Sequence, residues 1–108
     1  MAWCAGCPLE LTARTLPKVL GKNMIFVGTP SCSAPVLHGQ NLGAWHHLSY
    51  YANVMTGVAS SGTGLTRYYQ RTGQDATVVC FTGDGCATDI GFQPLSGAAE
   101  RQEKLIYL

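Results

Sequence analysis

The sequence predicts an α/β protein in which a partial parallel sheet carries helices on its faces. Three observations favour this fold class. Short, mostly apolar runs of strand length occur at residues 24–28, 77–82 and 104–108, segments with helical spacing separate them, and turn residues follow the first two runs. The resulting order of helix, strand, helix, strand, helix, strand is typical of right-handed parallel sheets, whose ligands gather at the carboxyl ends of strands.

The first half of the chain is predicted to contain a helix, a strand and a long loop. Residues 8–20 have the apolar spacing of an amphipathic helix, which Pro17 is expected to kink or end. A turn then leads into a buried strand at residues 24–28. The loop at residues 29–47 contains three histidines, a cysteine and a tryptophan, and its length is unusual for a connector. We therefore expect this loop to have a functional use.

The second half is predicted to alternate between helix and strand. Residues 48–71 suit a helix that its glycines weaken, although small residues there can permit tight packing. The strand at 77–82 is expected to be buried on both faces, because it is nearly all apolar and rich in β-branched residues. A helix at 87–101 follows, with Pro94 as an irregularity, and a last strand begins at 104–108. The residues expected on the apolar side of that helix are Ile90, Phe92 and Leu95.

Composition limits the chain to one domain, residues 1–108, because 108 residues build only one compact core. Only 12% of the residues are charged, which is a poor surface for a solitary monomer. A net charge of +1 without a basic cluster argues against nucleic-acid binding. No apolar run is long enough to cross a membrane and the start lacks a secretion signal, so we expect a cytoplasmic protein. We also expect the domain to be truncated, because its last apolar segment ends without turn residues.

The most informative motif is Gly83-Asp84-Gly85, directly behind the apolar run at 77–82. Glycines on both sides of Asp84 let the backbone approach a ligand closely, and the segment from Ala87 onward can present helix N-terminal N–H groups to phosphate oxygens. Asp84 would supply one hard oxygen ligand for Mg²⁺. The alternative is an ordinary strand-to-helix turn, since glycine and aspartate are common turn formers.

The five cysteines are an odd number, which argues against a disulfide framework and favours metal or redox chemistry. Cys4 and Cys7 form a C-x-x-C motif in which Gly6 relaxes the backbone demands, and Cys32 lies in the long loop. Their three thiolates can converge on an iron–sulfur cluster, or on zinc together with one of the histidines of the loop. Purely structural cysteines are the third possibility. Cys80 is expected to pack as a small hydrophobe, whereas Cys86 can face either a cofactor or the core.

Taken together, these motifs resemble the β subunit of 2-oxoacid:ferredoxin oxidoreductases, such as pyruvate:ferredoxin oxidoreductase. The resemblance covers nearly all of the chain, in the order and approximate spacing of that subunit's N-terminal part. The segments that carry it are Cys4-Ala5-Gly6-Cys7, Thr29-Pro30-Ser31-Cys32-Ser33, Gly83-Asp84-Gly85-Cys86-Ala87-Thr88-Asp89-Ile90-Gly91 and Leu95-Ser96-Gly97-Ala98.

The resemblance implies a thiamine-diphosphate-binding fold with three cofactors: thiamine diphosphate, Mg²⁺ and a 4Fe-4S cluster. It implies that Asp84 coordinates Mg²⁺ and that the metal ligands of the cluster include Cys4, Cys7 and Cys32. It further implies oxidative decarboxylation of a 2-oxoacid, with electrons passing through the cluster to ferredoxin and the acyl group to coenzyme A. An α subunit is the implied partner. The backbone implied to hold the diphosphate is that of Gly83, Asp84, Gly85, Cys86 and Ala87.

The chain departs from the family pattern in several places, among them Pro94 in a normally regular helix and the Asn53 region, which lacks an acidic residue often found there. It ends before the Asn-bearing segment that supplies further Mg²⁺ ligands, and before the fourth cysteine of the cluster. Cys86 stands where glycine is common in the family. We therefore expect an incomplete half-site that is inactive alone, and we assign no catalytic residue. The alternative function is a small non-catalytic metal-binding or interaction module that uses the same three cysteines.

Overall fold

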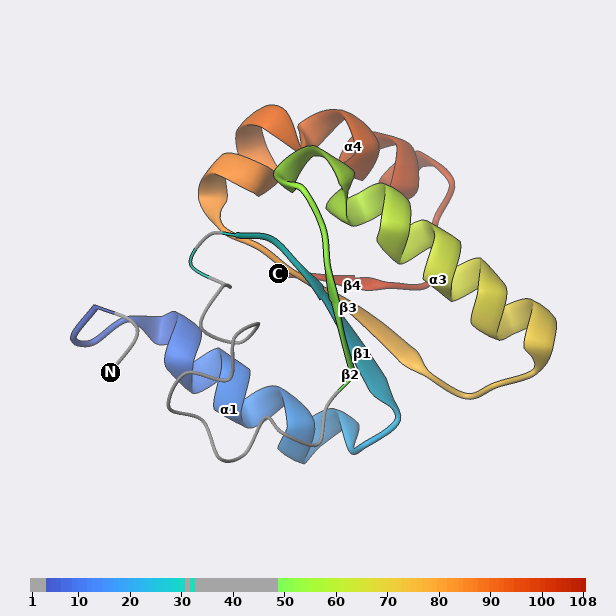
Figure 1. Cartoon of the computed structure of the whole chain (residues 1–108), viewed down its shortest axis with the longest axis horizontal. Helices are drawn as coiled ribbons and strands as arrows, with labels where there is room; N and C mark the ends of the chain where they lie inside the picture. Colours follow the sequence, from blue (N-terminus) through green and yellow to red (C-terminus); the bar gives the residue numbers. More distant parts are fainter. Residues whose placement is uncertain (1–3, 31, 33–48) are drawn as a thin grey trace.

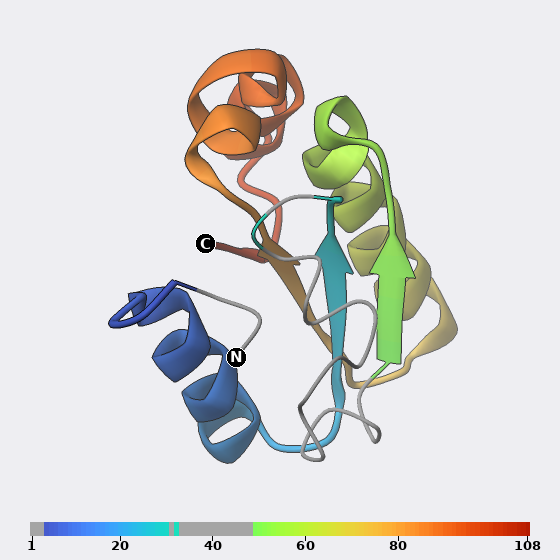
Figure 2. The same cartoon turned by 60° about the vertical axis from the view of Figure 1, so that its left-hand side comes forward.

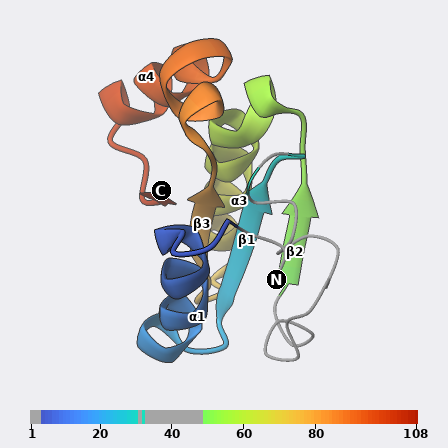
Figure 3. The same cartoon turned by 90° about the vertical axis from the view of Figure 1, so that its left-hand side faces the viewer.

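The computed structural model describes residues 4–30, 32 and 49–108. The four described strands form one sheet of order β2-β1-β3-β4, in which every pair is parallel. Figure 1 shows α1 on one side of this sheet and α3 and α4 on the other, and in Figure 3 β2, β1 and β3 point the same way. The predicted α/β fold class is confirmed. The elements are α1 (Pro8–Leu20), β1 (Met24–Gly28), β2 (Ser49–Ala52), η1 (Met55–Gly57), α3 (Val58–Thr72), β3 (Thr77–Phe81), η2 (Gly85–Ile90), α4 (Phe92–Glu100) and β4 (Ile106–Tyr107).

The two faces of the sheet are buried in separate apolar clusters, because successive strand residues point to opposite sides. On the α1 side, the rings of Phe26 and Phe81 meet edge to face with centroids 6.0 Å apart. On the other side, Val27 and Cys80 pack against α3 and its neighbours. β3 is therefore buried on both faces, as predicted. None of the described helices combines the length and the apolar character that crossing a membrane requires.

Helix α1 does not end at Pro17, although an end there was one of the two outcomes expected of this proline. Pro17 lies inside the helix, which continues to Leu20. Leu16 and Leu20 pack against the α1-side cluster, and this burial offsets the one hydrogen bond that a proline cannot donate. The helix instead ends at Gly21, whose φ of +77° favours glycine and whose N–H donates to the carbonyl of Pro17 at 3.0 Å.

The predicted helix at 48–71 is wrong at its start. Ser49–Ala52 forms strand β2, and α3 begins only at Val58. The consecutive residues Tyr50 and Tyr51 favour an extended backbone, and β1 offers a free parallel edge where Phe26 pairs with Tyr50. The prediction of tight packing by small residues agrees with the structure, because a side chain at Gly62 would collide with the sulfur of Cys80.

The predicted helix at 87–101 is two helices. A wide π-helical segment, η2, starts at Gly85, and the chain breaks from helical dihedrals at Asp89 (φ −123°, ψ −106°) before α4 starts at Phe92. Pro94 causes no irregularity, because an N–H in the first turn of a helix lacks an intrahelical partner anyway.

The break also changes which side chains the second helix buries. Ile90 and Phe92 were expected on the apolar side, but they are 49% and 57% exposed. Leu95 is half-buried. Because the dihedrals of Asp89 rotate η2 relative to α4, residues of the two segments do not lie on one continuous helical face.

Strand β4 lies at one end of the described sheet rather than at its centre. Within the predicted 104–108 segment, the strand comprises only Ile106–Tyr107. Its pairing with β3 continues one residue further, because the N–H of Leu108 donates to the carbonyl of Cys80 at 2.9 Å and the N–H of Thr82 donates to the carbonyl of Leu108 at 2.8 Å.

A charged cluster ties α3 to the connection between α4 and β4. Glu103 has a side chain only 2% exposed; it forms an ion pair with Arg67 at 2.9 Å and accepts a hydrogen bond from Arg101 at 3.1 Å. The neighbouring Arg67 guanidinium is the main cause that lowers the pKa of Glu103, although burial opposes it. The ion pair therefore stabilises the fold above the ordinary glutamate pKa, and this stabilisation is lost as pH falls through the lowered folded-state pKa.

We predict that Glu103→Gln makes the stability of the protein less dependent on pH in the acidic range. The unfolded carboxyl titrates near pH 4.3, so the urea midpoint of the unchanged protein should fall between about pH 5 and pH 3 more steeply than that of the variant. Urea unfolding followed by circular dichroism measures both. Glu100→Gln, at an exposed neighbouring carboxylate, is the matched control. Parallel pH profiles for Glu103→Gln and the unchanged protein would contradict the assignment.

Candidate functional site

The carboxyl ends of β1 and β3 lie side by side. Gly28 pairs with Phe81, so the segments that follow these two strands start next to one another. Thr29 and Thr82, the first residues after the strands, are both buried. In Figure 2 the segments that leave β2 and β3 toward η1 and η2 rise from the same end of the sheet. The turn with Pro30 and Cys32 and the Gly83-Asp84-Gly85 turn therefore share one edge, as the sequence predicts.

Asp84 presents an exposed carboxylate at this edge. Its backbone is already helical (φ −55°, ψ −46°), and its carbonyl accepts a hydrogen bond from the hydroxyl of Thr88 at 2.8 Å. Within the described ranges, no hydrogen bond or ion pair engages the Asp84 carboxylate. A carboxylate that is exposed and unengaged at the end of a buried strand can bind a hard cation such as Mg²⁺.

The backbone around Asp84 differs from the prediction in one respect. The helical segment starts at Gly85 rather than Ala87, and the N–H of Ala87 already donates to the carbonyl of Gly83 at 3.0 Å. The N–H groups at the start of a helix have no intrahelical partner. The donors that this turn can offer a ligand are therefore those of Gly85 and Cys86.

Met55 is a neighbour of this turn that the sequence did not reveal. A Cβ placed on Gly85 would lie 3.7 Å from the Cε of Met55, so the Met55 side chain lies against the turn. The thiol of Cys86, which is fully buried, donates to the carbonyl of Met55 at 2.9 Å. Cys86 therefore faces the core side of the turn and not solvent.

Asn53 explains how Met55 reaches this position. Its N–H donates to the carbonyl of Gly28 at 2.9 Å, which joins the segment after β2 to the end of β1. Its side-chain amide donates to the carbonyl of Gly57 at 2.9 Å and to the hydroxyl of Ser61. An asparagine two residues after a Tyr-Tyr pair is a turn signal that could have indicated the end of a strand here.

The cysteine motif has the expected local backbone. The N–H of Cys7 donates to the carbonyl of Cys4 at 3.0 Å, and Gly6 has a φ of +78°, which confirms the prediction for Gly6. Cys4 and Cys32 are exposed, whereas Cys7 packs against the α1-side cluster.

The structure does not bring the sulfurs of Cys4, Cys7 and Cys32 together in one metal site. Across residues 4–30, 32 and 49–108, no three Cys, His, Asp or Glu side chains are close enough to hold a metal ion. The histidines considered as zinc ligands, His38, His46 and His47, lie outside the described residues. Cys80 is buried as predicted, and burial is the main reason that its pKa is raised to about 12. Cys80 is therefore a protonated core residue at neutral pH.

Comparison with known proteins places this geometry in a family. Residues 27–108 match the family model described as thiamine pyrophosphate enzyme, C-terminal TPP binding domain. The chain belongs to this family. The match runs from β1 through β4 and so contains the Asp84 turn together with η1 and η2, whereas α1 and the Cys4–Cys7 motif precede it.

The relatives of this thiamine pyrophosphate enzyme domain are subunits of larger proteins. The chain is 36% identical over 106 residues to pyruvate synthase subunit PorB of Methanothermobacter thermautotrophicus, which covers 97% of this chain and 36% of that protein. It is 34% identical over 115 residues to ketoisovalerate oxidoreductase subunit VorB of Pyrococcus horikoshii, with coverage of 97% and 35%. It is 32% identical over 109 residues to NADH-dependent phenylglyoxylate dehydrogenase subunit beta of Aromatoleum evansii, with coverage of 100% and 24%.

These matches confirm the resemblance to the β subunit of 2-oxoacid:ferredoxin oxidoreductases over the whole chain. The chain spans about a third or less of the length of the three relatives.

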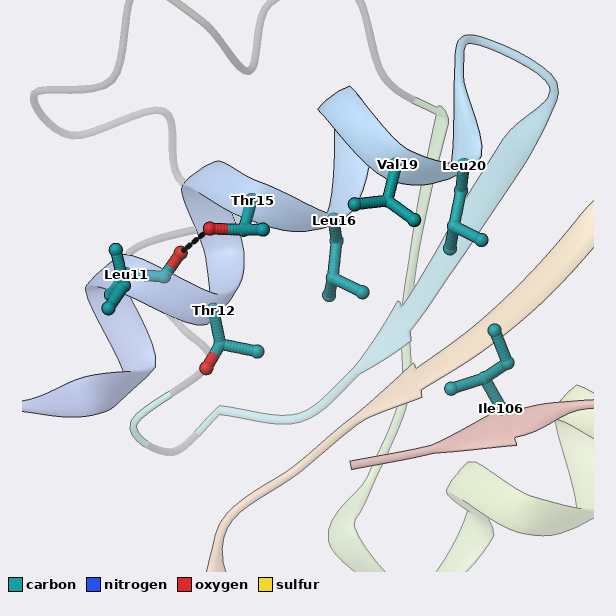
Figure 4. A pocket seen from close by; sticks show the side chains of 7 residues that line it. All are labelled: Leu11, Thr12, Thr15, Leu16, Val19, Leu20 and Ile106. Atoms are coloured by element: carbon teal, nitrogen blue, oxygen red, sulfur yellow. Dashed lines mark hydrogen bonds between the residues drawn. The ribbon is translucent and has the colours of Figure 1, made fainter.

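An apolar groove among the described residues lies away from the Asp84 turn. This groove of about 480 Å³ runs between α1 and β4 and shares no residue with the Asp84 turn. In Figure 4 the leucines of α1 and Ile106 of β4 line it, and the hydroxyl of Thr15 is turned back to donate to the carbonyl of Leu11 at 2.7 Å. Its polar groups are thus few, which makes it unsuited to a phosphate ligand. The lining residues are Leu11, Thr12, Thr15, Leu16, Val19, Leu20 and Ile106.

Proposed function

We propose that this chain forms the thiamine-diphosphate-binding part of an enzyme that oxidatively decarboxylates a 2-oxoacid. The observation that carries the proposal is the exposed and unengaged Asp84 carboxylate, between two glycines at the carboxyl end of β3. Membership of the thiamine pyrophosphate enzyme family supports it.

The residues present fit thiamine diphosphate with a magnesium ion. Asp84 would hold Mg²⁺ through a carboxylate oxygen, and the backbone from Gly83 to Ala87 would lie against the diphosphate, with the N–H groups of Gly85 and Cys86 as donors. Met55 would provide an apolar wall beside the turn. The chemistry that the cofactor supplies when bound is nucleophilic addition to a 2-oxo carbon and delocalisation of the charge left after CO₂ departs. The role of this chain is to hold and orient the cofactor.

The substrate class rests on the names of the relatives. Pyruvate, ketoisovalerate and phenylglyoxylate differ in their side chains but share the 2-oxoacid group. We propose the same class here, with a partner α subunit, because these relatives are named as subunits.

Electron transfer to ferredoxin through a 4Fe-4S cluster, with coenzyme A as acyl acceptor, is the remaining part of the proposal. The spacing of Cys4, Cys7 and Cys32 supports it, and at least one further ligand must come from outside the described residues. A visible spectrum after anaerobic purification separates it from the alternative, a non-catalytic metal-binding module. Iron–sulfur charge-transfer bands support the oxidoreductase, whereas a colourless zinc protein supports the module.

The binding proposal predicts that the chain takes up thiamine diphosphate only when Mg²⁺ is present. Isothermal titration calorimetry should show saturable binding with MgCl₂ and none after EDTA, because Asp84 would hold the metal ion that neutralises the charge of the diphosphate. Thiamine monophosphate is the matched control ligand, and it should bind at least about tenfold more weakly because it lacks the second phosphate. Equal binding of the two esters, or binding that EDTA leaves unchanged, would refute the proposed site.

A further inference from the structure

Cys86 lies where three elements of the described chain meet. It is the second residue of η2 and is fully buried. Its sulfur is 2.9 Å from the carbonyl oxygen of Met55 in η1 and 3.7 Å from the hydroxyl of Tyr107 on β4. The carbonyl can only accept, so the thiol donates to Met55. One side chain therefore joins the turn after β3 to the turn after β2.

Close backbone packing accompanies this hydrogen bond. A Cβ on Gly91, just after η2, would overlap the carbonyl oxygen of Cys86 and lie 2.9 Å from that of Met55. At the other end of η2, Gly85 contacts the side chain of Met55. Met55 thus lies near both the beginning and the end of η2, and there is no room for a side chain at Gly91.

The short length of η2 and the non-helical dihedrals of Asp89 within it make such a restraint necessary. Six residues do not form a stable isolated helix in water, so their conformation depends on tertiary contacts. Within the described residues, the thiol of Cys86 donates to the carbonyl of Met55 in η1, whereas the hydroxyl of Thr88 donates to the nearby carbonyl of Asp84.

We propose that Cys86 is a positioning residue, whose thiol hydrogen bond to the Met55 carbonyl holds η1 against η2 and so fixes the backbone that lies beside the diphosphate. The ligand named here rests on the proposed function. Cys86 takes no part in the chemistry, because its side chain is buried in the apolar cluster with Val58 and Cys80.

Three variants separate the hydrogen bond from general packing. Cys86→Ala removes the donor, and Cys86→Ser keeps a donor of similar size. Cys80→Ala is the matched control, because Cys80 is another fully buried cysteine of the same cluster, with its sulfur at a longer 3.8 Å from the carbonyl of Val58.

The first measurement is amide hydrogen exchange on the chain without ligand. In Cys86→Ala, amides of residues 55–57 and 85–90 should exchange about tenfold faster relative to those of α3, because the hydrogen bond that the buried thiol donates to the Met55 carbonyl is lost. Cys86→Ser and Cys80→Ala should leave this ratio unchanged to within about threefold. Equal exchange in the alanine and serine variants, or the same change in Cys80→Ala, would overturn the proposal.

The second measurement is the affinity for thiamine diphosphate with Mg²⁺. Cys86→Ala should weaken binding about tenfold, with serine restoring it to within about threefold. A merely structural role would lower the unfolding midpoint of both buried-cysteine variants without this difference in affinity. If exchange changes as expected but the unchanged chain binds no thiamine diphosphate, the positioning role stands and the proposed function fails. If the unchanged chain and Cys86→Ala bind thiamine diphosphate equally well, the positioning role is wrong and the proposed function stands.

Discussion

Replacing Gly91 with alanine is expected to destabilise the protein by about 3 kcal/mol. Gly91 is buried, and the new methyl group would meet the carbonyl oxygens of Cys86 and Met55, which belong to two different elements. Neither is the end of a flexible side chain, so η1 and η2 must move apart. The φ of Gly91 is −99°, which any residue can adopt, so the cost is steric and not conformational. Urea unfolding followed by circular dichroism measures the change.

Gly64→Ala is the control for this substitution. Gly64 lies in the interior of α3, and no atom is within 4 Å of a Cβ placed there. Alanine at that position should stabilise the protein by about 0.5 to 1 kcal/mol, because an exposed helical glycine has an entropic disadvantage. Opposite signs for the two variants are therefore expected. A loss below about 1 kcal/mol for Gly91→Ala would show that η1 and η2 are not packed as described.

Replacing Asp84 with asparagine is expected to weaken thiamine diphosphate binding at least about 100-fold and to abolish its dependence on Mg²⁺. Asparagine has nearly the same shape and keeps one oxygen, but it lacks the negative charge that attracts the cation. No described hydrogen bond or ion pair uses the Asp84 carboxylate, so the fold should not depend on it. The expected result is lost affinity at an unchanged unfolding midpoint, measured by calorimetric titration and thermal unfolding.

Asp75→Asn is the matched control for Asp84. Asp75 is also exposed and lies two residues before β3, at the opposite end of the same strand. The charge change is identical, so a purely electrostatic effect of the net charge would appear in both variants. Binding within about threefold of the unchanged protein is expected for Asp75→Asn. Comparable losses of affinity in the two variants would show that Asp84 does not bind the metal ion.

The central part of the fold could be predicted from the sequence because burial leaves a strong local signal. β1 and β3 are continuous apolar runs, and both were placed within a residue of their observed bounds. β2 has no such signal, because most of this four-residue edge strand is exposed. The break at Asp89 was missed for a different reason, since apolar spacing reports which face is buried and not a change of two dihedrals.

The candidate site could be predicted only as far as residues close in sequence specify it. Asp84 was recognised because its glycine neighbours and the preceding strand are adjacent to it along the chain. Asn53 and Met55 were missed because their roles depend on contacts with Gly28 and with residues 85–91, which are far away in sequence. Placing residues 48–71 in one helix hid these contacts.

The strand order also has a consequence for the kinetics of folding. The central strands β1 and β3 pair in register although about 50 residues separate them. Closing so long a loop before any of these contacts can form gives the domain a high contact order, which slows folding relative to helical bundles of the same size. During synthesis, β1 cannot complete its pairing with β3 until Phe81 has left the ribosome.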